Sequence, residues 1–184
     1  MNETINLMSK QAIEKLEDGN YCFMVTRVSK AIDMCFDTEP YEMIIDMDII
    51  DGPENEHKTH VTRTFHSGTK DDVNERYEKF CRSILGISQE EGFSADDIVG
   101  RFFTCQVYGC FDRYRMPLRV FKDIQPLNLR SALQAGIAQG TGPDDLQGFQ
   151  VVRSRRNGYA LLICNGQVQS ILAIEQGEQT QQKE

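Results

Sequence analysis

The order in which strand and helix patterns follow one another between residues 21 and 124 restricts the fold of this chain more than any other feature. Three strand-like segments come first, one helical pattern follows, and two further strand-like segments end the series. The clearest strand is residues 41–50, where apolar residues at every second position alternate with Glu42, Asp46 and Asp48. This order predicts a mainly β domain with one helix inserted between its third and fourth strands.

Periodicity and terminating residues predict the bounds of these elements. The expected strands are residues 21–31, 41–50, 58–66, 101–110 and 115–124. The expected helix begins near Asp72 and ends before Gly86, and apolar residues recur at helical spacing from Val73 to Leu85. One further helical turn is expected at residues 94–99. Five strands with a helix after the third are the elements of the OB-fold, a small barrel whose exposed face and loops bind single strands of nucleic acid.

Four parts are expected along the chain. They are an N-terminal helix over residues 1–19, the OB-fold domain over residues 20–127, an appendage over residues 128–175, and a disordered polar tail over residues 176–184. Within the appendage, Leu129, Leu133 and Ile137 favour a short helix. Asn-Gly pairs at residues 157–158 and 165–166 then predict a three-stranded meander, because Asn-Gly supplies the positive φ that tight hairpin turns need.

Charge is distributed unevenly along the chain, whose formal net charge is −8. Residues 31–57 contain nine acidic residues and no lysine or arginine. Residues 101–130 contain six basic residues against two acidic ones, Asp112 and Asp123. Such asymmetry is typical of a protein with one basic and one acidic face, so the negative total does not exclude a nucleic-acid partner.

Four short segments, taken in their order along the chain, resemble a known family. They are Gly19-Asn20-Tyr21, the alternating run 41–50 followed by Asp51-Gly52, Asp97-Ile98-Val99-Gly100-Arg101-Phe102, and Phe121-Lys122-Asp123-Ile124-Gln125-Pro126. They make residues 21–127 similar to phage and prophage OB-fold proteins that bind single-stranded DNA and accompany recombination and replication functions. The resemblance implies a non-enzymatic protein that binds single-stranded DNA with little sequence preference, in the cytoplasm of a bacterial host cell. The Gln-rich tail departs from the acidic tail common in such proteins.

An OB-fold holds a single strand with aromatic rings that stack on bases and basic side chains that contact phosphates. The strongest candidate region is the connection between the last two expected strands, where aromatic and basic residues interleave. The first and third expected strands supply further basic residues for the same groove. The candidate nucleic-acid-binding residues are Arg27, Lys30, Lys58, Arg63, Arg101, Phe111, Arg113, Tyr114, Arg115, Arg119 and Lys122. The alternative for these side chains is an ordinary solvated strand face, or packing over the end of the barrel.

The sequence contains no pattern typical of an enzyme or of a cofactor site. Asp46 and Asp48 lack the further carboxylates and the lysine that a metal nuclease needs, and His57 and His60 lack cysteines at zinc spacing. We therefore expect no metal, no cofactor and no catalytic residue. The six cysteines occur singly within apolar patterns, and we expect reduced, buried thiols.

Several expectations concern partners. No apolar run approaches the roughly 20 residues that cross a bilayer, and no secretory signal is present, so a cytoplasmic protein without a membrane partner is expected. Self-association into a homo-oligomer stays open. The acidic stretch 31–57 supports a rival function, an interaction or anti-defence inhibitor protein whose surface imitates nucleic acid and binds a host or phage protein. The group Arg153, Arg155 and Arg156 is either an extension of the DNA track or an ordinary basic hairpin tip.

Overall fold

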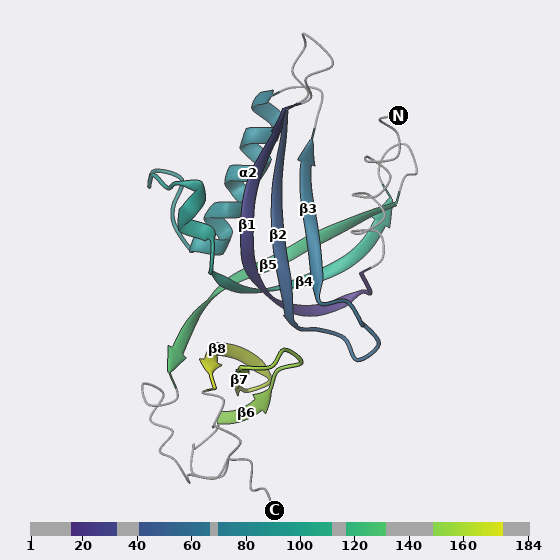
Figure 1. Cartoon of the computed structure of the whole chain (residues 1–184), viewed down its shortest axis with the longest axis vertical. Coiled ribbons are helices and arrows are strands. Elements are labelled where there is room, and N and C mark those ends of the chain that lie inside the picture. Colours follow the sequence, from purple (N-terminus) through teal and green to yellow (C-terminus); the bar gives the residue numbers. More distant parts are fainter. Residues whose placement is uncertain (1–15, 33–40, 67–69, 112–116, 132–148, 175–184) are drawn as a thin grey trace, which may run out of the picture. The chain divides into compact units, whose positions relative to one another are not determined.

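The structure is a computed structural model, and it describes residues 16–32, 41–66, 70–111, 117–131 and 149–174. The described chain is mainly β, with one α-helix and one short 3₁₀ helix (Figure 1). Neighbouring strands pair in the order β3-β2-β1-β4-β5-β8-β7-β6 to form a mixed sheet. The chain divides into two compact units, residues 1–127 and residues 128–184, and strand β5 continues from the first into the second.

The first unit contains the strands and helix in the predicted order. Its strands are β1 (Gly19–Ile32), β2 (Tyr41–Asp51), β3 (His60–His66), β4 (Phe102–Phe111) and the first part of β5 (Pro117–Ser131). Helix α2 (Lys70–Leu85) follows β3, and the 3₁₀ helix η1 (Ala95–Ile98) precedes β4. The mainly β prediction is therefore confirmed. The turn at η1 begins as predicted, because the Asp97 carboxylate accepts the Ser94 N–H at 2.6 Å.

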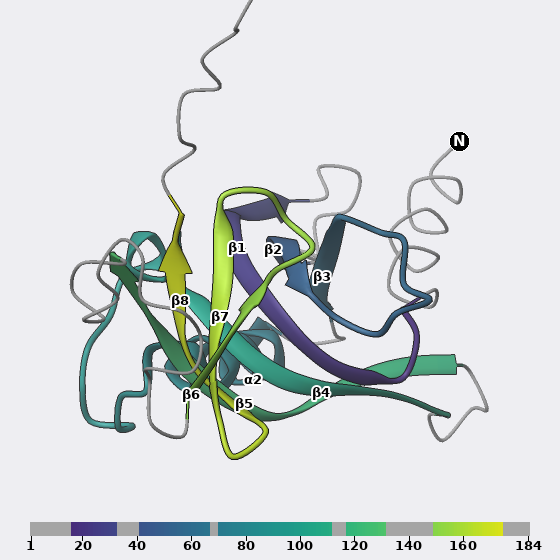
Figure 2. The ribbon, with the colours of Figure 1, turned by 90° about the horizontal axis from the view of Figure 1, so that it is seen from below.

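Strand β1 connects the two halves of this sheet. Its residues 19–24 pair antiparallel with β4, and its residues 22–32 pair antiparallel with β2. Register shifts after Cys22 and between Val25 and Arg27 mark irregularities of the bulge type, which increase the local twist and bend a strand. Strands β4 and β5 accordingly run across the direction of β2 and β3 (Figures 1 and 2).

Helix α2 packs on β2 and β3 through the apolar stripe that its spacing predicts. The buried residues of this stripe are Val73, Tyr77, Phe80, Cys81 and Ile84. They meet the inner face of the sheet, which alternation along each strand makes apolar. The inner-face residues are Tyr21, Phe23, Val25, Met43, Ile45, Met47, Val61, Phe65, Phe103, Cys105, Val107 and Phe121. Burial of this set forms the core of the first unit.

The first unit has the strand order of the predicted barrel but not its closure. Each strand in β3-β2-β1-β4-β5 pairs with the next, whereas β3 is an edge, and no ladder joins it to β5 within the described residues. Inner-face side chains meet between these two strands instead, because Arg63 of β3 lies over the ring of Phe121 of β5. The described sheet is open, so the prediction of a closed five-stranded barrel is not met.

The second unit contains the predicted three-stranded antiparallel meander (Figure 2). Its strands are β6 (Phe149–Arg153), β7 (Tyr159–Cys164) and β8 (Gln167–Ala173). In the turn between β7 and β8, Asn165 and Gly166 have φ angles of 51° and 75°, which is the pattern of a type I′ turn. Residues 128–131 of β5 pair in parallel with β8 and form the fourth strand of this unit.

Neither predicted flanking helix is present in the few of its residues that the structure describes, 16–19 and 129–131. Leu129 lies in β5, which runs through the expected boundary at Pro126 because β8 offers its backbone a parallel partner. Residues 16–18 are irregular, and the Glu17 N–H donates to the carboxylate of Glu56 at 3.1 Å. The other residues of both predicted helices, Leu133 and Ile137 among them, and the predicted tail 176–184 lie outside the described residues.

Candidate nucleic-acid interface

The outer face of β1, β4 and β5 carries a row of polar residues. Gln106 of β4 pairs directly with Asn20 of β1 and with Lys122 of β5, so the three side chains stand on one face of the sheet. All three are exposed. Cys105 and Val107, the neighbours of Gln106 in β4, face the core and are buried, as strand alternation requires.

Tyr108 is half-buried and stands on the same outer face, two residues after Gln106. The Nζ of Lys122 lies 5.2 Å from the centroid of the Tyr108 ring, which is a cation–π contact. We call Asn20, Gln106, Tyr108 and Lys122 the β4 surface. It combines an aromatic ring, a cation and two amides, and none of its four members is acidic. These groups can stack on a base, attract a phosphate and donate hydrogen bonds.

Arg119 stands on the opposite face of β5 from Lys122. It pairs with Gly109 of β4, and its Nη1 donates to Oδ1 of Asp18 at 2.6 Å. The same carboxylate oxygen accepts the Gly109 N–H at 2.9 Å. A Cβ at position 109 would collide with the guanidinium of Arg119, so the absence of a side chain there allows the contact. Arg119 is thus held in an ion pair and does not share a basic patch with Lys122.

Arg63 points into the core and not toward the outer face. It lies on β3 between Val61 and Phe65, both buried. Its guanidinium carbon is 4.9 Å from the ring centroid of Phe65, 4.6 Å from that of Phe80 and 4.4 Å from that of Phe121. Its Nε is buried and has no hydrogen-bond partner within the described structure. Burial lowers the pKa of Arg63 to about 10, so the side chain is still charged at neutral pH.

Arg27 is exposed on the outer face of β1, but a carboxylate engages it. Its Nε donates to Oδ2 of Asp46 at 2.7 Å, and the Thr62 hydroxyl donates to Oδ1 of Asp46 at 2.7 Å. Burial alone would raise the pKa of Asp46, but these hydrogen bonds and the charges of Arg27 and His60 outweigh it and lower the pKa. The Nδ1 of His60 also lies 3.2 Å from Oδ1 of Asp48. The carboxylates of Asp46 and Asp48 therefore have protein partners.

Two further candidates lie near segments that connect strands. Lys58 is half-buried between β2 and β3, and its backbone N–H donates to the Glu56 carboxylate at 3.0 Å. Arg101 is exposed just before β4, and its Nε donates to the carbonyl of Asp97 at 3.0 Å. Neither belongs to the β4 surface.

Five candidates have side chains that the structure does not describe. Lys30 lies in β1 and Phe111 is the last residue of β4. The connection between β4 and β5, which follows the β4 surface along the chain, holds Arg113, Tyr114 and Arg115. The assignment of these five to a binding site stays a prediction.

Glu56, the last acid of the stretch 31–57, is buried, and its carboxylate accepts several hydrogen bonds. Its carboxylate accepts the Tyr21 hydroxyl at 3.3 Å and the backbone N–H groups of Glu17 and Lys58 at 3.1 and 3.0 Å. Burial opposes ionisation, but these donors and the charge of Lys58 outweigh it and lower the pKa of Glu56. In the described part of the acidic stretch, Asp46, Asp48 and Glu56 thus have hydrogen-bond or ion-pair partners within the protein.

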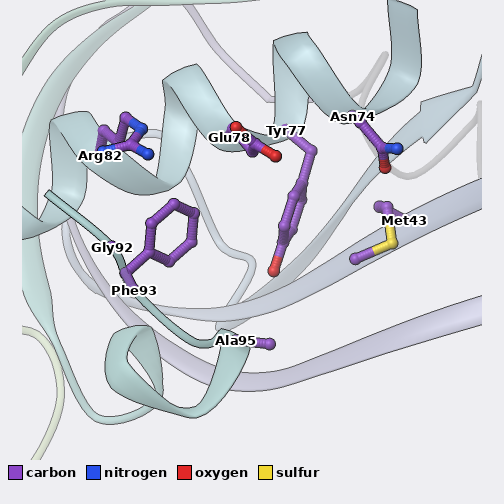
Figure 3. A pocket seen from close by; sticks show the side chains of 8 residues that line it. All are labelled: Met43, Asn74, Tyr77, Glu78, Arg82, Gly92, Phe93 and Ala95. Carbon is purple, nitrogen blue, oxygen red and sulfur yellow. The ribbon is translucent and has the colours of Figure 1, made fainter. Parts of the chain in front are cut away.

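A pocket of about 360 Å³ lies between α2 and the segment that leads into η1 (Figure 3). Its lining residues are Met43, Asn74, Tyr77, Glu78, Arg82, Gly92, Phe93 and Ala95. The Nη1 of Arg82 donates to the carbonyl of Ser88 at 2.6 Å, and its guanidinium carbon lies 5.1 Å from the centroid of the Phe93 ring. The cation of this pocket is thus already engaged, and its other charged member is Glu78. The pocket does not suit a phosphate.

Neither a group of metal ligands nor a membrane-spanning helix is found in the part of the chain that the structure describes. Within that part, no three His, Cys, Asp or Glu side chains are grouped to hold a metal ion. The described helices include none that is long and apolar enough to cross a membrane. Cys22, Cys81 and Cys105 are buried free thiols, whereas Cys110 and Cys164 are free but partly exposed.

The sequence analysis names Lys122 as a candidate, but not its neighbours on the β4 surface, Asn20, Gln106 and Tyr108. Alternation within residues 102–110 opposes Gln106 and Tyr108 to the buried Cys105 and Val107, and this pattern could have assigned them to the outer face. Their position beside Lys122 depends on the pairing of β4 with β5.

The chain matches no protein-family model, and no curated protein is significantly similar to it.

Proposed function

We propose that this protein binds single-stranded DNA with little sequence preference and that the β4 surface is part of its binding face. The observation that carries the proposal is the contact of Lys122 with the Tyr108 ring, beside two exposed amides in register. An aromatic ring stacks on any base, and an ammonium beside it attracts the adjoining phosphate. Such a pair binds a strand without reading its sequence.

The strand order supports the same proposal. The order β3-β2-β1-β4-β5, with α2 between β3 and β4 in the chain, is that of an OB-fold, although the strands described do not close into a barrel. The connection of residues 112–116, with Arg113, Tyr114 and Arg115, is then the loop that grips the strand. A role beside phage recombination and replication in the bacterial cytoplasm, without catalysis, completes the proposal and rests on the family resemblance.

Fluorescence anisotropy with a labelled oligo-dT of about 30 nucleotides, titrated at low and at moderate salt, tests the function. Binding should weaken steeply with salt. Tyr108→Ala should remove one stacked base and weaken binding by about 1–3 kcal/mol. Lys122→Ala should reduce the slope of log affinity against log salt by about 0.7. Tyr108→Phe, which keeps a ring, and Lys79→Ala, which removes an exposed lysine of α2, are the matched controls.

The outcomes separate the function from the site. A wild-type protein that does not bind the oligonucleotide at low salt contradicts the function. Binding that Tyr108→Ala and Lys122→Ala leave at wild-type strength contradicts the β4 surface and turns attention to Arg113, Tyr114 and Arg115.

The rival function, an acidic protein that imitates nucleic acid, rests on the composition of residues 31–57. Asp46, Asp48 and Glu56 have partners within the protein, so they add little to a surface that must attract a basic partner. We therefore favour strand binding. If a basic protein co-purifies with this one, and neutralising the exposed acids of residues 31–57 abolishes the co-purification, the rival function would be favoured instead.

A further inference from the structure

We propose that the pocket beside α2 binds an arginine side chain on an exposed basic segment of a partner protein. The carboxylate of Glu78 holds the guanidinium group, and apolar atoms of the pocket hold its methylene stem. The inference goes beyond strand binding and does not depend on it, because it concerns another part of the first unit and another class of ligand.

The two walls of the pocket are fixed to each other. One wall consists of residues at helical spacing on α2, namely Asn74, Tyr77, Glu78 and Arg82. Residues of the segment 92–95 form the facing wall (Figure 3). Arg82 joins the two, because its Nη1 donates to the carbonyls of Ser88 and Glu91 in the segment that follows the helix. A pocket that is held open in this way loses little conformational entropy when a ligand enters.

These bonds of Arg82 leave Glu78 without its usual helical partner. The two side chains are four residues apart on α2, a spacing at which a glutamate and an arginine commonly form an ion pair. Arg82 instead binds the two carbonyls, and its guanidinium carbon lies 5.1 Å from the centroid of the Phe93 ring. Glu78 is exposed, and it forms no ion pair with any residue that the structure describes. Its negative charge can therefore attract a cation from outside.

The arrangement of groups along the pocket favours an arginine as that cation. Arg82 and Phe93 lie at one end, Met43 and Asn74 lie at the other, and Glu78 lies between them (Figure 3). A long basic side chain can enter at the end away from Arg82, pack its stem on Met43 and reach the carboxylate. A planar guanidinium donates two parallel hydrogen bonds to a carboxylate, whereas a lysine offers a point charge. The volume of about 360 Å³ is at the small end for ligand pockets and suits one side chain.

An acidic segment borders the pocket. Residues 83–100, all of which the structure describes, contain four acidic residues and no lysine, arginine or histidine. The four acidic residues are Glu90, Glu91, Asp96 and Asp97, and all are exposed. A single amine in the pocket gains little from charges spread along a segment, whereas a basic chain that lies across them gains from each. The ligand that fits both the pocket and its border is therefore a basic protein segment.

The pocket and the β4 surface lie on opposite faces of the sheet. Helix α2 packs on the inner face, from which Met43 reaches the pocket, whereas Gln106 and Lys122 stand on the outer face. One site is suited to a cation and the other to a polyanion. A basic protein segment and a single strand of DNA can therefore be bound at the same time.

The test adds a soluble peptide, with two arginines among glycines and serines, to the isotope-labelled full chain. Nuclear magnetic resonance should show shifts of the backbone signals of Gly92 and Ala95 and of the side-chain amide of Asn74. A peptide with citrulline in place of arginine keeps the shape and loses the charge, so it should bind about tenfold more weakly or worse. Oligo-dT in excess should not displace the arginine peptide.

Variants of the protein test the role of Glu78. Glu78→Gln keeps the size of the side chain and removes the carboxylate, so it should weaken the arginine peptide by about tenfold or more. Asp123→Asn is the matched control, because it removes an exposed carboxylate from β5 at a φ of 50°, which asparagine tolerates. At physiological salt this variant should bind the peptide within about twofold of the wild type.

The contrary outcomes are distinct. The inference is overturned if no signal of the pocket shifts, if Glu78→Gln binds like the wild type, or if the citrulline peptide binds as tightly as the arginine peptide. Spermidine that displaces the peptide at a lower concentration would make a polyamine the ligand and overturn the docking of a protein segment. Displacement by oligo-dT would overturn the separation of the two sites. A protein that binds the peptide but no oligonucleotide supports this inference and contradicts the proposed function.

Discussion

The guanidinium carbon of Arg63, on β3, lies 4.4 Å from the ring centroid of Phe121, on β5. These two strands are not joined by a ladder within the described residues, so a cation against an aromatic ring stands where a closed barrel would have backbone hydrogen bonds. Phe65 and Phe80 extend the contact to further rings. Cation–π attraction and packing of the methylene stem offset part of the cost of burying the charge.

Replacement of Arg63 tests this balance. Arg63→Ala should destabilise the protein by about 2–4 kcal/mol, because it removes the packed stem and leaves space among Phe65, Phe80 and Phe121. Arg63→Met keeps an unbranched apolar chain without a buried charge and should lie within about 1 kcal/mol of the wild type. Urea denaturation at neutral pH measures both. If Arg63→Met lowers the free energy of unfolding as much as Arg63→Ala does, the charge of Arg63 itself stabilises the fold. Neither variant, where folded, should alter the proposed affinity for single-stranded DNA, since Arg63 faces the core.

Gly109 is predicted to control the ion pair of Arg119 with Asp18. Gly109→Ala places a methyl group where the guanidinium lies, so Arg119 must move and lose its 2.6 Å contact with Asp18. The loss should be about 1 kcal/mol, because the pair is partly exposed and the arginine end can shift. A double-mutant cycle with Arg119→Met checks the mechanism. The second substitution should cost little once the first is present, and full additivity would show that the two residues act independently.

Asp46 should make stability depend on pH in the acid range. Its pKa is lower in the folded protein than the usual value near 3.8, so its contribution is present above that value and is lost as pH falls through the folded pKa. Asp46→Asn should cost about 1–3 kcal/mol at neutral pH, since Arg27 loses its carboxylate. Urea denaturation between about pH 7 and pH 3 should show the wild-type advantage shrinking at the acid end. If the difference in unfolding free energy between the wild type and Asp46→Asn stays constant across this range, Asp46 does not have a lowered pKa in the folded protein.

The five thiols that lie in the described residues should divide into two reactivity classes. Burial raises the pKa of Cys81 and Cys105 to about 12 and that of Cys22 further, so these side chains are neutral and enclosed in the native state. Cys110 and Cys164 are partly exposed. Iodoacetamide labelling followed by peptide mass spectrometry should modify Cys110 and Cys164 first. The three buried thiols should react only after denaturation, and native labelling of Cys105 at the rate of Cys164 would contradict the burial of Cys105 in the core.

Local patterns predicted those elements whose structure depends on nearby residues. Helix α2 follows from the spacing of Val73, Tyr77 and Phe80, and β2 follows from alternation over residues 41–50. The turn at Asn165 and Gly166 follows from the backbone freedom of these two residues. Alternation along β3 also places Arg63 with Val61 and Phe65 on the inner face, although its charge led us to assign it to the DNA groove.

The sequence by itself determined the mainly β class, the order of the strands and helix, and which residues alternate along each strand, because these properties arise from interactions between near neighbours. Tertiary structure decided which strands pair. Parallel pairing with β8 carries β5 past Pro126 where a helix was expected, and pairing of β1, β4 and β5 brings Asn20, Gln106 and Lys122 into one row. Within the described residues it also left β3 and β5 without a shared ladder, with Arg63 between them. Such long-range contacts leave no periodic trace in the segments that make them, which is why the candidate binding face was only partly predicted.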